Sequence, residues 1–164
     1  MDTWKEIDRA SSDEARAILR AACGAERWVD RMLAHRPFGS RDALLARARD
    51  VWFALSEDDW REAFDHHPQI GDRESLRRRF PDTHHLSARE QSGVAQGTDD
   101  VLRALAAGNQ QYLEKFGYIF IVCATGKSAG EMLEILRGRM SNDAGVEIRK
   151  AAEEQARITA LRLA

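Results

Sequence analysis

The chain has 164 residues, with 25 lysines and arginines against 27 aspartates and glutamates, which gives a formal net charge of -2. This length suits a single domain, 1–164, and is sufficient to bury a hydrophobic core. The near-balanced charge excludes a global attraction to nucleic acid or to an anionic membrane, so either role would need a local basic patch.

The two cysteines, Cys23 and Cys123, are far apart and belong to no close-spaced Cys/His cluster. This usage favours free thiols in a reducing compartment. The N-terminal segment lacks an apolar signal region, and the longest apolar run, near 119–124, is far too short to span a bilayer. We therefore expect a cytoplasmic protein with no membrane association.

Helix-forming residues dominate the chain, and only three prolines interrupt them. We predict an all-α, single-domain bundle of roughly seven to nine helices. Ser12, Ser40 and Ser56 each precede apolar residues at helical spacing and indicate helix starts. Asp59 lies three residues after Ser56 and nearly completes a capping box there.

The stretch "FDHHPQIGD" places two histidines directly before a proline. Pro68 disfavours the α region at the preceding residue, so a helix through Asp65 should end at about His66 or His67. Histidine is favourable at a helix C-terminus, so at least one of the pair should act as a cap. A histidine with a pKa of about 6.5 is equally suited to proton transfer at neutral pH.

Other candidate motifs give weak signals. His84 and His85 form a second pair, but adjacent histidines rarely bind one ion and the i, i+4 spacing of a helical zinc site is absent, so we predict no metal. The arginines of "RESLRRRF" suit a solvated helix face as well as a phosphate site. The "GKS" string lacks the upstream glycines of a P-loop, and no nucleophile elbow occurs.

The segment "LSAREQSG" has a serine, Ser87, three residues before Glu90. This is capping-box spacing, so Glu90 could bind the amides of its own helix. A carboxylate in a first turn is also stabilised by the helix dipole and is ready to accept a hydrogen bond. The structural and the functional interpretations are compatible.

The segment 98–117 predicts a long central helix, with Val101, Leu105, Tyr112 and Phe116 near one stripe and Gly117 as its C′ residue. The run "YIFIVCATG" follows and favours β structure, but no second comparable run could pair with it. We expect a short extended segment near 118–123 whose backbone groups need other partners. Two helices, over 128–140 and 146–163, complete the chain.

The last helix places Arg162 among apolar residues of one face, with Ile148, Ala151, Ala152, Ile158 and Leu163. A guanidinium directed at a core keeps its charge and needs an anionic partner from the protein or from a ligand. The alternative is that the helix has frayed by this point and the side chain reaches water. The spacing leaves both alternatives open.

Four segments follow one another in a specific order and spacing: "HHPQIGD", "SAREQSGV", "NQQYLEKFGYIFIVCATGKSAGEMLEILRGRMSND" and "EIRKAAEEQARITALRL". In these segments the chain resembles the decarboxylases of 2-oxo-4-hydroxy-4-carboxy-5-ureidoimidazoline (OHCU). The resemblance covers nearly the whole chain. It implies a cofactor-free carboxy-lyase that converts OHCU to (S)-allantoin, the last step of urate conversion to allantoin in purine catabolism.

The resemblance also implies residue roles. His67 matches the catalytic histidine of the family, Glu90 its catalytic acid and Gln91 the neighbouring substrate-binding amide. The remaining substrate-binding positions that match are Pro68, Ser87, Ile119, Phe120, Ile121 and Arg162. The family further implies a homodimer and functional coupling to the upstream 5-hydroxyisourate hydrolase.

The chemistry of OHCU accounts for the lack of a cofactor. Its carboxylate is attached to a carbon next to a ring C=N bond, which can accept the electron pair that CO2 leaves behind. We expect His67 to handle the proton of the C4 hydroxyl, with Glu90 orienting it or sharing the proton relay. Which of the two is acid and which is base stays open.

Two rival functions remain. A non-enzymatic helical binding or regulatory module would use the histidines as caps and Arg162 in an ordinary ion pair. A metal-dependent helical hydrolase would use His66, His67, His84 and His85. Metal analysis and a decarboxylation assay distinguish these alternatives.

Overall fold

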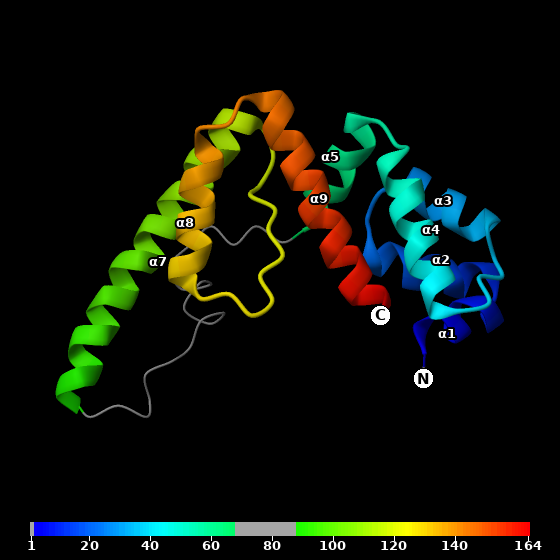
Figure 1. Ribbon diagram of the computed structural model, residues 1–164, viewed down its shortest axis with the longest axis horizontal. Coiled ribbons are helices and arrows are strands. Elements are labelled where there is room, and N and C mark those ends of the chain that lie inside the picture. The colour runs from blue at the N-terminus through cyan, green and yellow to red at the C-terminus, as the bar shows by residue number, and fades with distance from the viewer. Residues whose placement is uncertain (1, 68–87) are drawn as a thin grey trace. The chain divides into compact units, whose positions relative to one another are not determined.

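The computed structural model describes residues 2–67 and 88–164, with side chains described outside 88–98 (Figure 1). The described residues contain eight helices and no strand, which confirms the predicted all-α class and helix number. The helices are α1 (Thr3–Arg9), α2 (Ser12–Ala22), α3 (Glu26–Ala34), α4 (Arg41–Phe53), α5 (Glu57–Asp65), α7 (Ala88–Phe116), α8 (Ala129–Met140) and α9 (Ala144–Leu163).

The chain forms two compact units. The first unit comprises Met1–His67 with Ile148–Ala164, and the second comprises Pro68–Glu147. The first turn of α9 belongs to the second unit, and the rest of that helix belongs to the first. A single domain over 1–164 stays a prediction.

Three buried tryptophans tie the helices of the first unit together. The indole N–H of Trp28 donates to the carbonyl of Ala48 at 3.0 Å, which joins α3 to α4. Trp52 donates to Ala152 at 2.9 Å and joins α4 to α9. Trp60 donates to Trp52 at 2.9 Å and joins α5 to α4. Because each ring is buried and its polar atom is satisfied, these contacts fix the end of α5 and the inner face of α9 within one core.

Side-chain caps begin the helices much as the sequence predicts. Ser40 accepts the amide of Ala43 at 3.1 Å, and Ser56 forms the predicted capping box with Asp59. The helix start at Ser12 is confirmed, and the N-cap is the preceding residue, Ser11. Glu14 lies three residues after Ser11, and its carboxylate accepts a hydrogen bond from the Ser11 amide at 3.2 Å, which completes a reciprocal box.

The second unit is built on α7, which begins at Ala88, ten residues before the predicted Thr98. It ends at Phe116, and Gly117 follows with φ +84°, so the predicted C′ glycine is confirmed. The helices α7 and α8 lie side by side (Figure 1). Gly108 permits this approach, because a Cβ there would lie 2.5 Å from Leu136 of α8.

Candidate functional site

His67 follows the C-terminus of α5, as the proline rule predicts. The helix ends at Asp65, His66 is the C-cap residue, and the amide of His67 donates to the carbonyl of Phe64 at 3.1 Å. Phe64 is fully buried and packs edge-on against Trp52, with 6.4 Å between the ring centroids. The backbone that carries His67 is therefore attached to the core of the first unit.

The two neighbouring histidines have different surroundings. His66 is exposed, and its ring lies on the backbone of Gly24, between α2 and α3. A Cβ at Gly24 would lie 2.3 Å from Cγ of His66, closer than any real contact. His67 is half-buried and faces α9 instead.

A chain of buried polar groups on α9 holds the His67 ring. Nε2 of His67 lies 2.5 Å from Oε1 of Gln155. The Gln155 amide nitrogen donates to Oγ1 of Thr159 at 3.0 Å, and that hydroxyl donates to the carbonyl of Ala22 at 3.4 Å. We call these three side chains and this carbonyl the His67 relay. Gln155 is fully buried, so its amide has exchanged water for these two partners.

Sequence reasoning missed Gln155 and Thr159. Both lie on the buried stripe of α9 that contains Ile148, Ala151, Ala152 and Leu163, whereas the predicted member Ile158 is only half-buried. The available signal was the i, i+4 spacing of two uncharged polar residues within an apolar face. Such residues need partners when buried, and Gln155 finds one in His67.

The surroundings of His67 favour its neutral form. Burial lowers the pKa of His67 from its ordinary value of 6.5, and the positive charges of Arg162 and His66 act in the same direction. The hydrogen bond to Gln155 acts against this shift, because a carbonyl oxygen stabilises the imidazolium. Near neutral pH the ring is therefore unprotonated at one nitrogen and can accept a proton.

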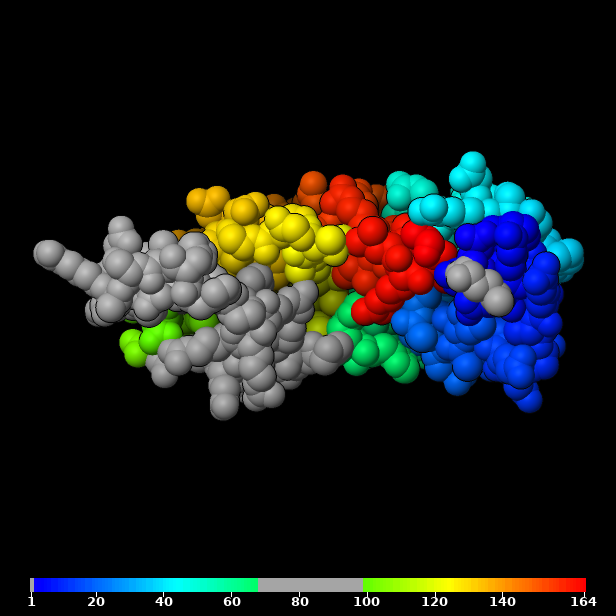
Figure 2. Space-filling model, turned by 90° about the horizontal axis from the view of Figure 1, so that it is seen from below, coloured from blue at the N-terminus to red at the C-terminus, as the bar shows by residue number. Residues whose placement is uncertain are grey.

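Arg162 reaches the C-terminus of α2. Its guanidinium donates to the carbonyls of Ala21 and Ala22 at 3.4 Å each, at the negative end of the helix dipole. The side chain is exposed, and no carboxylate among the described residues pairs with it. The exposure agrees with the second alternative, but α9 continues to Leu163, so the helix has not frayed at Arg162. Figure 2 shows this end of α9, in red, against the blue helices of the first unit.

The predicted extended segment forms neither helix nor strand between 119 and 124. Two of its carbonyls accept hydrogen bonds from cationic side chains, as the missing strand partner requires. Arg139 donates to the carbonyl of Ile121 at 2.5 Å, and Lys127 donates to that of Cys123 at 2.7 Å. Ile121 is buried, whereas Ile119 and Phe120 are half-buried.

A buried ion pair fixes this segment in the second unit. Nε and Nη2 of Arg139 donate to Oε2 of the fully buried Glu147 at 2.8 and 2.5 Å, and the Tyr112 hydroxyl donates to the same oxygen. Burial raises the pKa of Tyr112, so its hydroxyl remains a donor. The guanidinium also lies 4.7 Å from the Phe120 ring centroid. We call these four side chains the Arg139 cluster.

The structure describes some of the other predicted site residues and not the rest. Pro68 and Ser87 lie outside the described residues. Glu90 and Gln91 lie in the first turn of α7, where the helix dipole favours a carboxylate, but their side chains lie outside the description. Of the rest, His67 and Arg162 belong to the first unit, and Ile119, Phe120 and Ile121 belong to the second. A common site for both groups stays a prediction.

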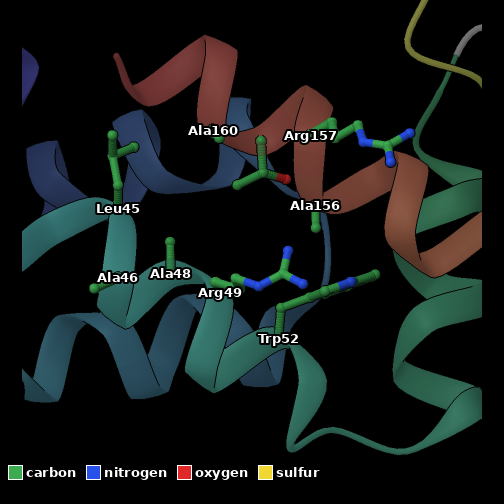
Figure 3. A pocket seen from close by; sticks show the side chains of 9 residues that line it. Leu45, Ala46, Ala48, Arg49, Trp52, Ala156, Arg157 and Ala160 are labelled. Carbon is green, nitrogen blue, oxygen red and sulfur yellow. The ribbon is translucent and has the colours of Figure 1, made fainter. Parts of the chain in front are cut away.

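A pocket of about 350 Å³ lies between α4 and α9 (Figure 3). Leu45, Ala48 and Trp52 of α4 face Ala156 and Ala160 of α9 across it, so its lining is mostly apolar. The Arg157 side chain extends away from it (Figure 3). None of the predicted site residues lines this pocket, and only Thr159 of the His67 relay does.

The described residues contain neither a cluster of metal ligands nor a membrane-spanning helix. Within residues 2–67 and the side chains after 98, no three His, Cys, Asp or Glu residues gather into a metal site. His84 and His85 lie outside the described residues, so the metal prediction stays open. No helix in the described part of the chain is long and apolar enough to cross a membrane.

Comparisons with known proteins give consistent matches. A family model described as OHCU decarboxylase matches residues 8–164. The uric acid degradation bifunctional protein TTL of Arabidopsis thaliana is 37% identical over 146 residues, 88% of this chain and 45% of that protein. The 2-oxo-4-hydroxy-4-carboxy-5-ureidoimidazoline decarboxylase of Xenopus laevis is 27% identical over 97 residues, 59% of this chain and 55% of that protein. The chain thus spans about half the length of these curated relatives.

Two solved structures share the fold. A crystal structure of OHCU decarboxylase in the presence of (S)-allantoin matches with a TM-score of 0.72 and 33% identity, covering 94% of this chain and 96% of that chain. A crystal structure of (S)-allantoin synthase matches with a TM-score of 0.68, covering 99% of this chain and 53% of that chain. Its identity is 20%, so this second match concerns the fold alone.

Proposed function

Because the chain belongs to the OHCU decarboxylase family, whose model matches residues 8–164, we propose that it decarboxylates OHCU to (S)-allantoin without a cofactor. The observation that carries the proposal is His67, a half-buried histidine with a lowered pKa, at the position that matches the catalytic histidine of the family. The solved OHCU decarboxylase, which aligns with 94% of this chain, supports the same assignment.

In the proposed reaction the substrate itself accepts the electron pair, and the protein has to transfer protons. The bond between C4 and the carboxylate breaks, CO2 leaves, and the electron pair forms a C4=C5 bond while the former C=N pair moves to the ring nitrogen. This nitrogen takes a proton from water. The enol then loses its hydroxyl proton and gains a proton at C5, which gives the carbonyl of allantoin. One net proton is consumed, and a single histidine can carry the hydroxyl proton away and supply the proton at C5.

His67 suits this proton transfer because it is neutral before the reaction begins. Delivery of the proton to one face of C5 would set the configuration of the product. In this proposal, Glu90 orients the hydroxyl or shares the proton, and Ser87, Gln91 and Arg162 hold the polar groups of the substrate. The same proposal assigns substrate binding to Pro68, Ile119, Phe120 and Ile121.

The decisive assay generates OHCU freshly from urate and follows its decay with and without the protein. OHCU decays spontaneously to racemic allantoin, so the assay records both the decay rate and the optical activity of the product. We expect faster decay and optically active allantoin of the S configuration only. An unchanged rate with racemic product would refute the proposal and favour the binding-module alternative.

We further propose a cytoplasmic homodimer that works beside 5-hydroxyisourate hydrolase. The coupling is supported by the Arabidopsis thaliana relative, which is called a bifunctional protein of uric acid degradation and of which this chain spans 45%. Light scattering of the purified protein tests the dimer. A coupled assay with the hydrolase in the same tube tests the coupling, since direct transfer of OHCU would reduce its accumulation in solution.

A further inference from the structure

The donors and acceptors of the His67 relay determine where each of its hydrogens points. The carbonyl of Ala22 can only accept, so the Thr159 hydroxyl directs its hydrogen toward it, at 3.4 Å. The Cys23 thiol also lies within hydrogen-bonding reach of the Thr159 side chain, but burial raises its pKa to about 11, so it stays a neutral thiol, which is a weaker acceptor than a carbonyl. The Thr159 oxygen therefore offers a lone pair to its other neighbour.

That neighbour is the Gln155 amide nitrogen, 3.0 Å from Oγ1 of Thr159. An amide nitrogen only donates, which matches the lone pair on the hydroxyl. With the nitrogen directed at Thr159, the amide oxygen is directed at His67, 2.5 Å from Nε2. The two oxygen acceptors in series, on Ala22 and Thr159, thus fix the orientation of the Gln155 amide, which lies between Thr159 and His67.

An amide oxygen only accepts, so Nε2 of His67 must carry the hydrogen in this contact. A neutral imidazole has one N–H group, which leaves Nδ1 as the nitrogen with the free lone pair. We propose that Gln155 is a positioning residue that holds His67 in its Nε2–H tautomer, so that Nδ1 takes and returns the substrate proton. The tautomer follows from these contacts alone, while the role of Nδ1 in catalysis rests on the proposed function.

The relay holds the ring in both of its charge states. When Nδ1 gains the hydroxyl proton of the substrate, Nε2 keeps its own proton and its bond to Gln155. The groups that act on the His67 charge in the described part of the chain are Gln155, Arg162 and His66. Gln155 favours the imidazolium and the other two oppose it, so the proton is returned readily to C5 and the resting base is restored.

The tautomer is measured directly by NMR of protein labelled with ¹⁵N and ¹³C in histidine, without any substrate. The His67 signals are assigned by their loss in His67→Asn. At a pH above the His67 pKa, we expect the nitrogen shifts of the Nε2–H tautomer in the wild type and a mixture of tautomers in Gln155→Leu. A wild-type Nδ1–H tautomer, or a tautomer unchanged in Gln155→Leu, would overturn the proposal.

Kinetics separates positioning from packing. We expect Gln155→Leu to lower kcat about 10- to 100-fold with little change in KM, the range typical of partners that orient a functional histidine. Gln155→Glu supplies a charged acceptor, so the acid limb of the pH–rate profile should move to higher pH. The positioning role would be contradicted if the acid limb of the pH–rate profile stayed in place in Gln155→Glu. It would also be contradicted if Gln155→Leu lowered kcat/KM only by raising KM, with kcat unchanged.

Thr159 provides the matched pair. Thr159→Ser keeps the hydroxyl and should retain the wild-type tautomer and rate, whereas the isosteric Thr159→Val removes the acceptor and should behave like a milder Gln155→Leu. Equal behaviour of the two Thr159 variants would contradict the relay. If the wild type does not decarboxylate OHCU at all, the proposed function fails, but the NMR measurement still decides the tautomer by itself.

Discussion

Nε2 of His67 lies 2.5 Å from Oε1 of Gln155, although 88 positions separate the two residues in the chain. His66, the preceding residue, packs its ring on Gly24 instead. The fold therefore distinguishes two histidines that look alike in the sequence. His67 is held by a buried amide, and its burial lowers its pKa.

This difference predicts unequal effects of the same substitution. His67→Asn should nearly abolish the acceleration of OHCU decay, because no other group at that position can accept the hydroxyl proton; general-base groups contribute about 10²- to 10⁴-fold. His66→Asn should retain most of the rate, since His66 is the C-cap residue of α5 and its ring packs on Gly24. The rate of OHCU decay above the spontaneous rate, measured for both variants, checks this prediction. Circular dichroism spectra show whether both variants are folded. Near-normal turnover by His67→Asn would contradict the assignment.

The pH dependence of stability offers a second test of His67. Its pKa in the folded protein lies below the ordinary value of 6.5, so between these two values the unfolded chain binds more protons at this residue. The free energy of unfolding should therefore decrease as the pH falls below about 6.5, and this part of the decrease should be absent in His67→Asn. Urea unfolding of both proteins across pH 5 to 8 measures the difference. Parallel profiles for the two proteins would show that the pKa is not lowered.

Local signals predicted the helix ends well. The caps at Ser40 and Ser56, the stop after Asp65 and the glycine at 117 each depend on residues within a few positions of one another. The helix start at Ser12 has the same local origin, because Ser11 and Glu14 form the capping box at this end of α2. The capping-box spacing of Ser87 and Glu90 indicates a helix start there, and α7 begins at Ala88. The polar stretch before Thr98 carries no apolar stripe, so the sequence does not indicate that this helix is continuous with 98–117.

The partners within the site could not be predicted in this way. Nothing near His67 in the sequence indicates Gln155, and nothing near Ile121 indicates Arg139, because both pairs are formed by packing of helices distant in the sequence. What the spacing did indicate was a need for partners. It predicted that Arg162, on an apolar face, needs an anionic partner unless its side chain reaches water. It also predicted that the carbonyls of the extended segment need donors, but it did not identify the partner residues.

The Arg139 cluster predicts strong coupling between two buried charges. Glu147→Gln leaves the Arg139 guanidinium without its anion, and Arg139→Met leaves the Glu147 carboxylate without its cation, so each should lower the free energy of unfolding by about 3–5 kcal/mol. The double variant should be less destabilised than the sum, since neither charge is then left alone. Urea unfolding of the four proteins completes the cycle.

The exposed pair Arg20 and Glu26 provides the control for this cycle. Both side chains are nearly half exposed, so Arg20→Met should cause a much smaller loss than Arg139→Met. Additive effects at Arg139 and Glu147 would contradict a coupled cluster. Arg139→Met additionally removes the donor to the Ile121 carbonyl, so hydrogen exchange should accelerate more in 119–124 than in α8.

Gly24 predicts a steric link between the turn after α2 and His67, the proposed catalytic histidine. A Cβ at this position would lie 2.3 Å from Cγ of His66, so Gly24→Ala must displace the His66 ring and, with it, the adjacent His67. We expect a stability loss of about 1–3 kcal/mol, typical of overpacking, together with a lower rate of OHCU decarboxylation. Gly138→Ala is the matched control, since no atom lies within 4 Å of the Cβ that it would add.

A compensating change makes this prediction specific. His66→Ala removes the ring that the new methyl group would strike, so the double variant Gly24→Ala with His66→Ala should recover stability and rate relative to Gly24→Ala alone. The recovery is expected because the clash involves the side chain of His66, while the proton transfer is assigned to His67. Thermal unfolding and the OHCU assay on the four proteins measure it. If the double variant were no better than Gly24→Ala, the loss would arise from the backbone of the turn and the contact with His66 would be incidental.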